Sequence, residues 1–166
     1  MTDEVMHFAE KIGGYIGCSF MGLSAIPNDC ERFLGMQGMH GHFASSMANK
    51  RADLIIGIGI RFSDRATGNT EKYAKNTTVI QLDVDQSEIN KNIIVDVGVK
   101  GDIKDSLQRI TEAVEKKART QWDEIIAELR QQETKIEDAR RITTSRRNTI
   151  NPPPASLRRE IGRAHV

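Results

Sequence analysis

The chain has 166 residues, the size of one domain that can bury a substantial core. Its 24 lysine and arginine residues balance 23 acidic residues, so no overall field draws it to nucleic acid or to an anionic membrane. Cys18 and Cys30 lack CxxC spacing, and the sequence shows neither an apolar run of spanning length nor a signal-peptide start. We therefore expect a protein of a reducing, cytoplasmic compartment.

The first third of the chain predicts two helices separated by a strand and loops. Apolar residues recur at helical spacing over 3–13, where a glycine pair offers a left-handed stop. Residues 15–20 are β-compatible and predict a short strand that runs into a turn-forming loop. The segment 35–41 contains three glycines and predicts a loop that opens a helix over 42–50.

The following segments alternate between strands and helices. Continuous apolar runs at 53–59 and 77–85 are typical of strands covered on both faces, and 95–102 predicts one more. The segment 85–88 offers an acidic cap with Glu88 at the third helical position, similar to a capping box. Apolar residues at helical spacing over 103–114 predict a helix after the last strand.

This alternation predicts an α/β fold: an open, mainly parallel, Rossmann-like sheet with helices on both faces. Ligands of such sheets bind beyond the carboxyl ends of the strands. A further amphipathic helix follows Thr120, and we expect the domain to span 1–141 and a linker to span 142–159. Residues 160–166 can be back-translated into a stretch of a widely used sequencing adapter, so we interpret them as a sequencing or assembly artefact.

The strongest local motif runs from Gly57 to Arg65, where a buried-type strand ends in glycine and presents two arginines and an aspartate. Close backbone approach and guanidinium forks suit a phosphate or diphosphate. The motif is not a dinucleotide fingerprint, because GxGxxG needs glycine where Phe62 stands. From this motif alone, a structural turn and a ligand site are equally good interpretations.

Other polar residues have two interpretations each. Asp83, at the end of a strand, suits either a ribose hydroxyl or a turn. Asp102 suits a ligand, but helix capping is the better interpretation. His40 and His42 form an HxH pair without further ligands nearby in sequence, so we expect a backbone or cofactor-edge role and no metal site.

Three blocks resemble acetolactate synthases in order and spacing: residues 20–23, 34–41 and 61–68. The similarity continues through 81–92 and 101–104. In that family the catalytic subunit has three α/β domains, and the central one binds FAD in an extended pose while the outer two share thiamine diphosphate and Mg²⁺. The resemblance identifies this chain with the central domain.

The resemblance also implies an FAD site, residue by residue. Arg61 is expected beside the phosphates or ribityl chain, Asp83 beside the adenosine ribose, and Met39 with His40 near the flavin or the active-site entrance. The family commonly has two aspartates after Arg-Phe, whereas here the first is Ser63. The implied FAD-binding residues are Phe20, Met21, Gln37, Gly38, Met39, His40, Gly59, Ile60, Arg61, Phe62, Ser63, Asp64, Asp83, Val84, Asp102 and Ile103.

For the whole enzyme, the resemblance implies a transferase of branched-chain amino-acid biosynthesis. It decarboxylates pyruvate on thiamine diphosphate and joins the two-carbon unit to a second 2-oxo acid, pyruvate or 2-oxobutanoate. A homodimer or tetramer with a small regulatory subunit is implied, with FAD in a structural role. The glutamate that activates thiamine diphosphate and the Gly-Asp-Gly motif that anchors Mg²⁺ belong to flanking domains, so we expect this chain alone to be inactive.

Two alternatives stay open at this point. Pyruvate oxidase, or another thiamine-diphosphate enzyme, has the same fold with similar FAD loops, although the Gly-Met-His-Gly and Arg-Phe-x-Asp-Arg blocks favour acetolactate synthase. The second alternative is a non-catalytic nucleotide-binding module that regulates or scaffolds a partner.

Overall fold

A computed structural model describes residues 1–68, 70, 73–74 and 76–150 of the chain. The chain forms two compact units, Met1–Arg130 and Gln131–Val166. The artefact predicted at 160–166 lies outside the described residues, as does the 151–159 part of the predicted linker.

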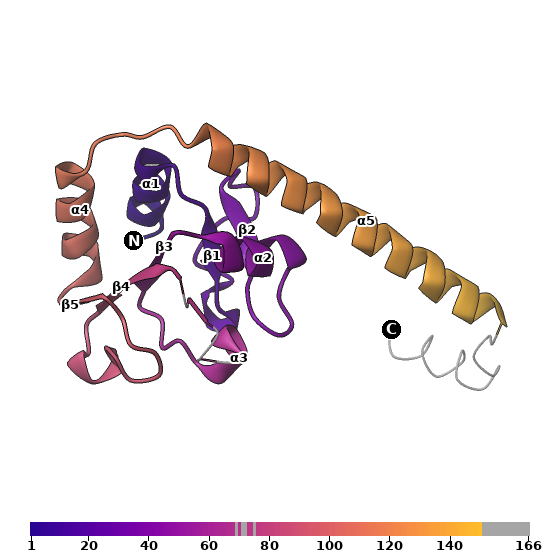
Figure 1. The fold of residues 1–166 in the computed structure, drawn as a ribbon, viewed down its shortest axis with the longest axis horizontal. Coiled ribbons are helices and arrows are strands. Elements are labelled where there is room, and N and C mark those ends of the chain that lie inside the picture. Colours follow the sequence, from indigo (N-terminus) through magenta and orange to yellow (C-terminus); the bar gives the residue numbers. More distant parts are fainter. Residues whose placement is uncertain (69, 71–72, 75, 151–166) are drawn as a thin grey trace, which may run out of the picture. The chain divides into compact units, whose positions relative to one another are not determined.

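Parallel strands form the centre of the first unit (Figure 1). β1 (Ile16–Cys18) pairs with β2 (Phe33–Met36), while β3 (Leu54–Ile58), β4 (Thr78–Asp83) and β5 (Val97–Lys100) form a second sheet in that order. All three pairings are parallel, which confirms the predicted α/β class. The strands lie in two sheets rather than in one continuous sheet, because no strand among the described residues joins β1 to β3.

Two helices cover one face of the three-stranded sheet. α1 (Thr2–Ile12) ends at Gly13, whose φ of 68° is the left-handed stop that the glycine pair predicted. α4 (Ile103–Ala113) packs beside α1, and Leu107 of α4 is fully buried with Phe8 of α1 and Leu82 of β4. The strand-then-helix prediction is confirmed for this part of the chain.

The opposite face of the same sheet is covered by loops. Val79 packs there with Phe62, Ile89 and Val95, which come from the segments after β3 and before β5. Because successive strand residues point to opposite faces, Gln81 lies on the same face as Val79. A buried polar side chain therefore stands where the loops meet the sheet.

The two-stranded sheet has its own core. α2 (Phe43–Arg51) contributes Ala44 and Ala48, which pack with Leu34 of β2 and with Ile126 and Leu129. The last two belong to α5 (Thr120–Ile150), whose residues up to Arg130 are part of the first unit. Strand β2 was not predicted, since glycines dominate its neighbourhood; its pairing with β1 and the burial of Leu34 explain it.

Short helical turns follow three of the strands. A 3₁₀ turn, η1 (Phe20–Gly22), follows β1, α3 (Asp64–Thr67) follows β3, and a second 3₁₀ turn, η2 (Gln86–Glu88), follows β4. The cap predicted for η2 is confirmed, because the Asp85 carboxylate accepts a hydrogen bond from the Ser87 N–H.

In the second unit, α5 continues from Gln131 to Ile150, so the helix extends beyond residue 141, where we expected the domain to close. The placement of that boundary stays a prediction. Among the described residues, no helix is long and apolar enough to cross a bilayer.

The core beneath α4 gives a stability prediction. Leu107→Ala should lower the free energy of unfolding of the full chain by about 2–5 kcal/mol, because it leaves a cavity between α1, α4 and β4. Urea unfolding followed by circular dichroism measures the change. Gln108→Ala is the matched control, since its exposed side chain lies next to Leu107 on the same helix, and it should leave the midpoint almost unchanged. Equal losses in the two variants would contradict the assigned core.

Candidate functional site

Every residue of the predicted binding site lies at or just beyond the carboxyl end of a strand. Phe20 and Met21 follow β1, 37–40 follow β2, and 59–64 follow β3. Asp83 ends β4 with Val84 after it, and 102–103 follow β5. The carboxyl ends of parallel strands meet at one edge of a sheet, which is where α/β proteins bind ligands.

The loop after β2 makes backbone hydrogen bonds to the end of β1 and to α3. The Gln37 N–H donates to the Cys18 carbonyl at 2.9 Å, and the Met39 N–H donates to the Arg65 carbonyl at 3.2 Å. The Gln37 side-chain oxygen also accepts a 2.7 Å hydrogen bond from Asn49 of α2. The structure thus brings the predicted residues 37–40 next to α3.

A second set of contacts joins the residues directly after β3 and β5 to the end of β4. The Gly59 N–H donates to the Leu82 carbonyl at 2.9 Å, and the Gly101 N–H donates to the Asp83 carbonyl at 3.0 Å. Gly59 has a φ of 58°, and a Cβ placed there would lie 3.3 Å from Ile103. These contacts hold the predicted residues after three neighbouring strands side by side.

Phe62 anchors the loop after β3. Its ring is 2% exposed and meets Tyr73 edge to face, with the ring centroids 5.9 Å apart. Its φ of 47° is left-handed, a conformation that costs a non-glycine residue on the order of 1–3 kcal/mol and that concentrates at functional sites. Burial raises the pKa of the Tyr73 hydroxyl, so this group beside Phe62 stays uncharged at neutral pH. The same hydroxyl accepts a hydrogen bond from Asn49.

The structure supports the turn and capping interpretations of the predicted aspartates. Asp83 is 8% exposed, and its carboxylate accepts a hydrogen bond from the Asp85 N–H at 2.9 Å. Asp102 caps α4 by accepting from the Asp105 N–H at 2.9 Å, as expected. The hydrogen bond from the Ser87 N–H lowers the pKa of Asp85, so that carboxylate is charged at neutral pH.

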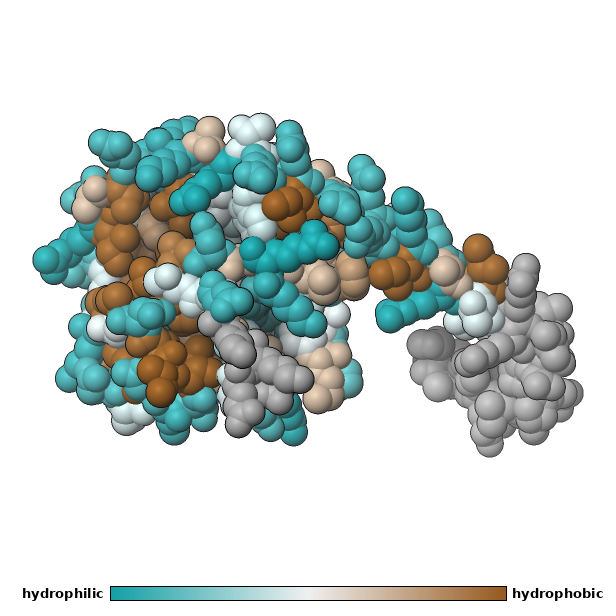
Figure 2. Space-filling model, viewed as in Figure 1, coloured by the Kyte–Doolittle hydropathy of each residue, from teal (hydrophilic) through white to brown (hydrophobic). Residues whose placement is uncertain are grey.

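Large apolar side chains are exposed beyond the carboxyl ends of the two-stranded sheet. Phe20, Met21 and Met39 are 74%, 87% and 75% exposed, and all three come from loops at the carboxyl ends of β1 and β2. Figure 2 shows that apolar residues reach the surface of the first unit among mostly hydrophilic neighbours. Exposed side chains of this size favour contact with a flat apolar group or another protein surface.

The two predicted histidines have different surroundings. His40 is exposed in the turn after β2. The His42 N–H donates to the Met36 carbonyl at 2.7 Å, and its ring lies against Gly35, where a Cβ would meet it. His42 is thus held at the start of α2, where it is the N-cap residue.

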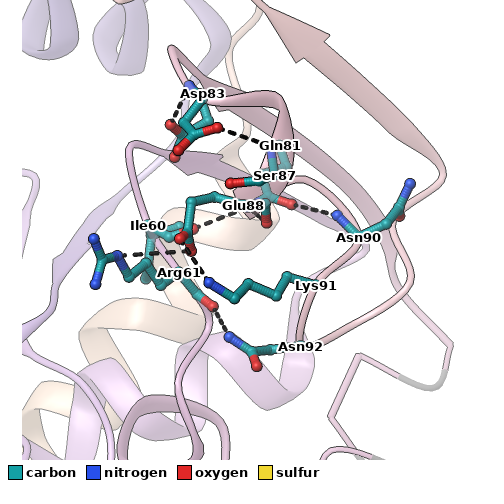
Figure 3. A network of polar contacts seen from close by, with 10 residues as sticks. Ile60, Arg61, Gln81, Asp83, Ser87, Glu88, Asn90, Lys91 and Asn92 are labelled. Carbon is teal, nitrogen blue, oxygen red and sulfur yellow. Dashed lines mark hydrogen bonds and ion pairs between the residues drawn. The ribbon is translucent and has the colours of Figure 1, made fainter.

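The resemblance implied no site role for three polar residues near Arg61, which are Gln81, Glu88 and Lys91 (Figure 3). Gln81 is fully buried, and Glu88 is almost so. The Arg61 guanidinium lies 3.6 Å from the Glu88 carboxylate, which also accepts a 2.8 Å hydrogen bond from Lys91. The available signal was Gln81 itself, a polar residue within an otherwise apolar strand.

Comparison with known proteins gives the family. Residues 1–110 match the thiamine pyrophosphate enzyme central domain. The chain belongs to that family. The match covers all five strands and every predicted site residue.

Several curated proteins are similar in sequence to this thiamine pyrophosphate enzyme central domain. An acetolactate synthase large subunit of Haemophilus influenzae is 41% identical over 107 residues, covering 64% of this chain and 19% of that protein. The isozyme 3 large subunit of Escherichia coli is 39% identical over 123 residues, covering 74% and 21%. A chloroplastic acetolactate synthase of Arabidopsis thaliana is 38% identical over 117 residues, covering 70% and 18%. The chain spans about a fifth of the length of these relatives.

The contact between the loop after β2 and α3 can be tested at Gly38. Its φ is 104°, and a Cβ there would lie 2.5 Å from the Arg65 carbonyl oxygen. Gly38→Ala should therefore open the loop and speed hydrogen exchange at the Met39 amide, which donates to that carbonyl. Exchange measured by mass spectrometry or NMR gives the result.

Gly68→Ala is the control for backbone strain alone. Its φ is 67°, but among the described residues no atom lies within 4 Å of a Cβ at that position. It should leave exchange at Met39 unchanged. Equal acceleration in the two variants would mean that strain, and not the contact with Arg65, controls the loop.

Proposed function

We propose that this chain is the FAD-binding central part of an acetolactate synthase subunit. The observation that supports this most is that all sixteen residues implied as the FAD site lie at one type of position, the carboxyl ends of parallel strands, within the segment that matches the family. The names of the relatives support the same activity. In our proposal the domain spans 1–141, with 142–159 as a linker.

The exposed groups at this edge fit a flavin dinucleotide. Phe20, Met21 and Met39 offer polarisable and aromatic surfaces for the isoalloxazine ring. The Arg61 side chain is 76% exposed, so its guanidinium is available to a diphosphate. The chemistry of this set, apolar at one end and cationic at the other, matches an extended dinucleotide.

The remaining residues of the proposed site act through their backbones and caps. Gly59 and the following residues let the main chain approach the ligand closely. Asp83 is held by the Asp85 N–H, which orients its carboxylate for ribose hydroxyls. Asp102 is fixed as the cap of α4, so the α4 N-terminus and Ile103 close the adenosine side.

In our proposal, domains on either side of this one make up the rest of the enzyme. They bind thiamine diphosphate and Mg²⁺, and thiamine diphosphate supplies the electron sink for decarboxylation of pyruvate and transfer of the two-carbon unit to pyruvate or 2-oxobutanoate. The enzyme is a cytoplasmic homodimer or tetramer with a small regulatory subunit. This central domain contributes shape and cofactor contacts, and FAD has a structural role.

The proposed diphosphate contact predicts a selective binding defect. In the full-length gene product, Arg61→Met should weaken FAD binding by about 10- to 100-fold, the worth of a charge-assisted contact, and leave riboflavin binding unchanged because riboflavin has no phosphate. Flavin fluorescence titration measures both affinities. Arg109→Met removes an exposed arginine of α4 and should change neither. A parallel loss for riboflavin would contradict the assignment of Arg61.

The proposed activity is tested on the same full-length product. With thiamine diphosphate, Mg²⁺ and FAD it should form acetolactate from pyruvate. Replacing FAD by 5-deaza-FAD, which does not support one-electron or oxygen chemistry, should preserve the activity if the flavin is structural. Loss of activity with the analogue, together with oxygen consumption by the protein that holds FAD, would instead favour a pyruvate oxidase.

A further inference from the structure

The buried amide of Gln81 connects two segments to β4. Its Nε2 donates to the Ile60 carbonyl at 3.0 Å and to the Glu88 carbonyl at 3.1 Å, and its Oε1 accepts from the Asn90 N–H at 3.3 Å. The side chain is 0% exposed, so these bonds replace all contact with water. The loop after β3 and the turn after β4 are thereby held at a fixed separation.

The backbone around Arg61 is held on both sides. The Ile60 carbonyl accepts from Gln81, and the Arg61 carbonyl accepts a 2.6 Å hydrogen bond from the Asn92 side chain. The next residue, Phe62, is anchored in the core. The Cα of Arg61 is therefore fixed, and only its long side chain retains freedom.

Glu88 restricts that side chain. Its side chain is 11% exposed, and its Oε2 lies 3.6 Å from the Nε of Arg61. Among the described residues, Oε2 has no hydrogen-bond partner, while Oε1 accepts from Lys91 at 2.8 Å. A buried carboxylate needs compensating positive charge, and these two cations supply it.

We propose that Glu88 is a positioning residue that pre-orients Arg61 for a dinucleotide diphosphate. Contact through Nε leaves the terminal Nη1 and Nη2 pointing away from Glu88, as Figure 3 shows. That end of the guanidinium forms two parallel hydrogen bonds with an oxyanion. The three charged groups together carry a net positive charge, so the carboxylate orients Arg61 without cancelling the attraction for phosphate. This inference rests on the proposed FAD site.

The alternative is that Glu88 only stabilises the fold. The burial of Glu88 and its bond to Lys91 are expected for both roles, so they do not distinguish them. The two roles differ in one respect: a positioning role acts through Arg61 and affects only ligands that carry phosphate, whereas a structural role affects the whole site. The test therefore compares ligands and couples the two residues.

The experiment is a double-mutant cycle on the full-length gene product. Glu88→Gln, Arg61→Met and the double variant are titrated with FAD and with riboflavin by flavin fluorescence. Glu88→Gln should weaken FAD binding about tenfold with riboflavin unchanged, and in the Arg61→Met background it should add almost nothing. Glu115→Gln, an exposed glutamate beyond α4, is the matched control and should have no effect.

Glu88→Asp guards against a folding defect. It keeps the negative charge but shortens the side chain, so it should reproduce the selective loss for FAD while thermal unfolding shows a folded protein. Losses that add in the double variant, or that are equal for FAD and riboflavin, would overturn the positioning role while leaving the FAD site in place. If the wild type binds no FAD, the proposed function fails, and this inference fails with it.

Discussion

The hydrogen bonds of one buried amide hold the candidate site together. Gln81 lies in the middle of β4, and its side chain bonds to the loop after β3 and to the turn after β4. An apolar residue at that position would leave two backbone carbonyls and one N–H without these partners, each at a cost of about 1–3 kcal/mol. The position of Arg61 therefore depends on a residue that is itself inaccessible to any ligand.

This arrangement also explains how the strained loop after β3 is maintained. Phe62 has a left-handed backbone, and its burial with Val79, Ile89 and Val95 offsets that strain. Gly57 makes room for the ring, since a Cβ there would lie 2.5 Å from Phe62. The loop is thus held by packing on one side and by hydrogen bonds on the other, and the exposed Arg61 lies between them.

Much of the fold could be predicted from local pattern. The apolar runs that became β3 and β4 and the helical spacing that became α1 and α4 are local signals, and these elements agree with the structure within a few residues. Strand β2 was missed because its existence depends on pairing with β1, a non-local contact that glycine-rich sequence conceals. The break between the two sheets is likewise a matter of pairing, which no single segment encodes.

For the proposed site, the resemblance predicted residues that lie at the carboxyl ends of strands in the structure. The similarity covers Glu88 but implied no site role for it, because that role depends on a distance of 3.6 Å to a residue 27 positions earlier in the chain. The capping-box pattern even suggested a different partner for its carboxylate, because that motif directs the glutamate back to the Asp85 N–H. In the structure Asp83 already occupies that N–H, so the Glu88 side chain turns to Arg61 and Lys91. A local motif thus predicted the turn correctly, and a competing hydrogen bond redirected its carboxylate toward the arginine that the proposed site requires.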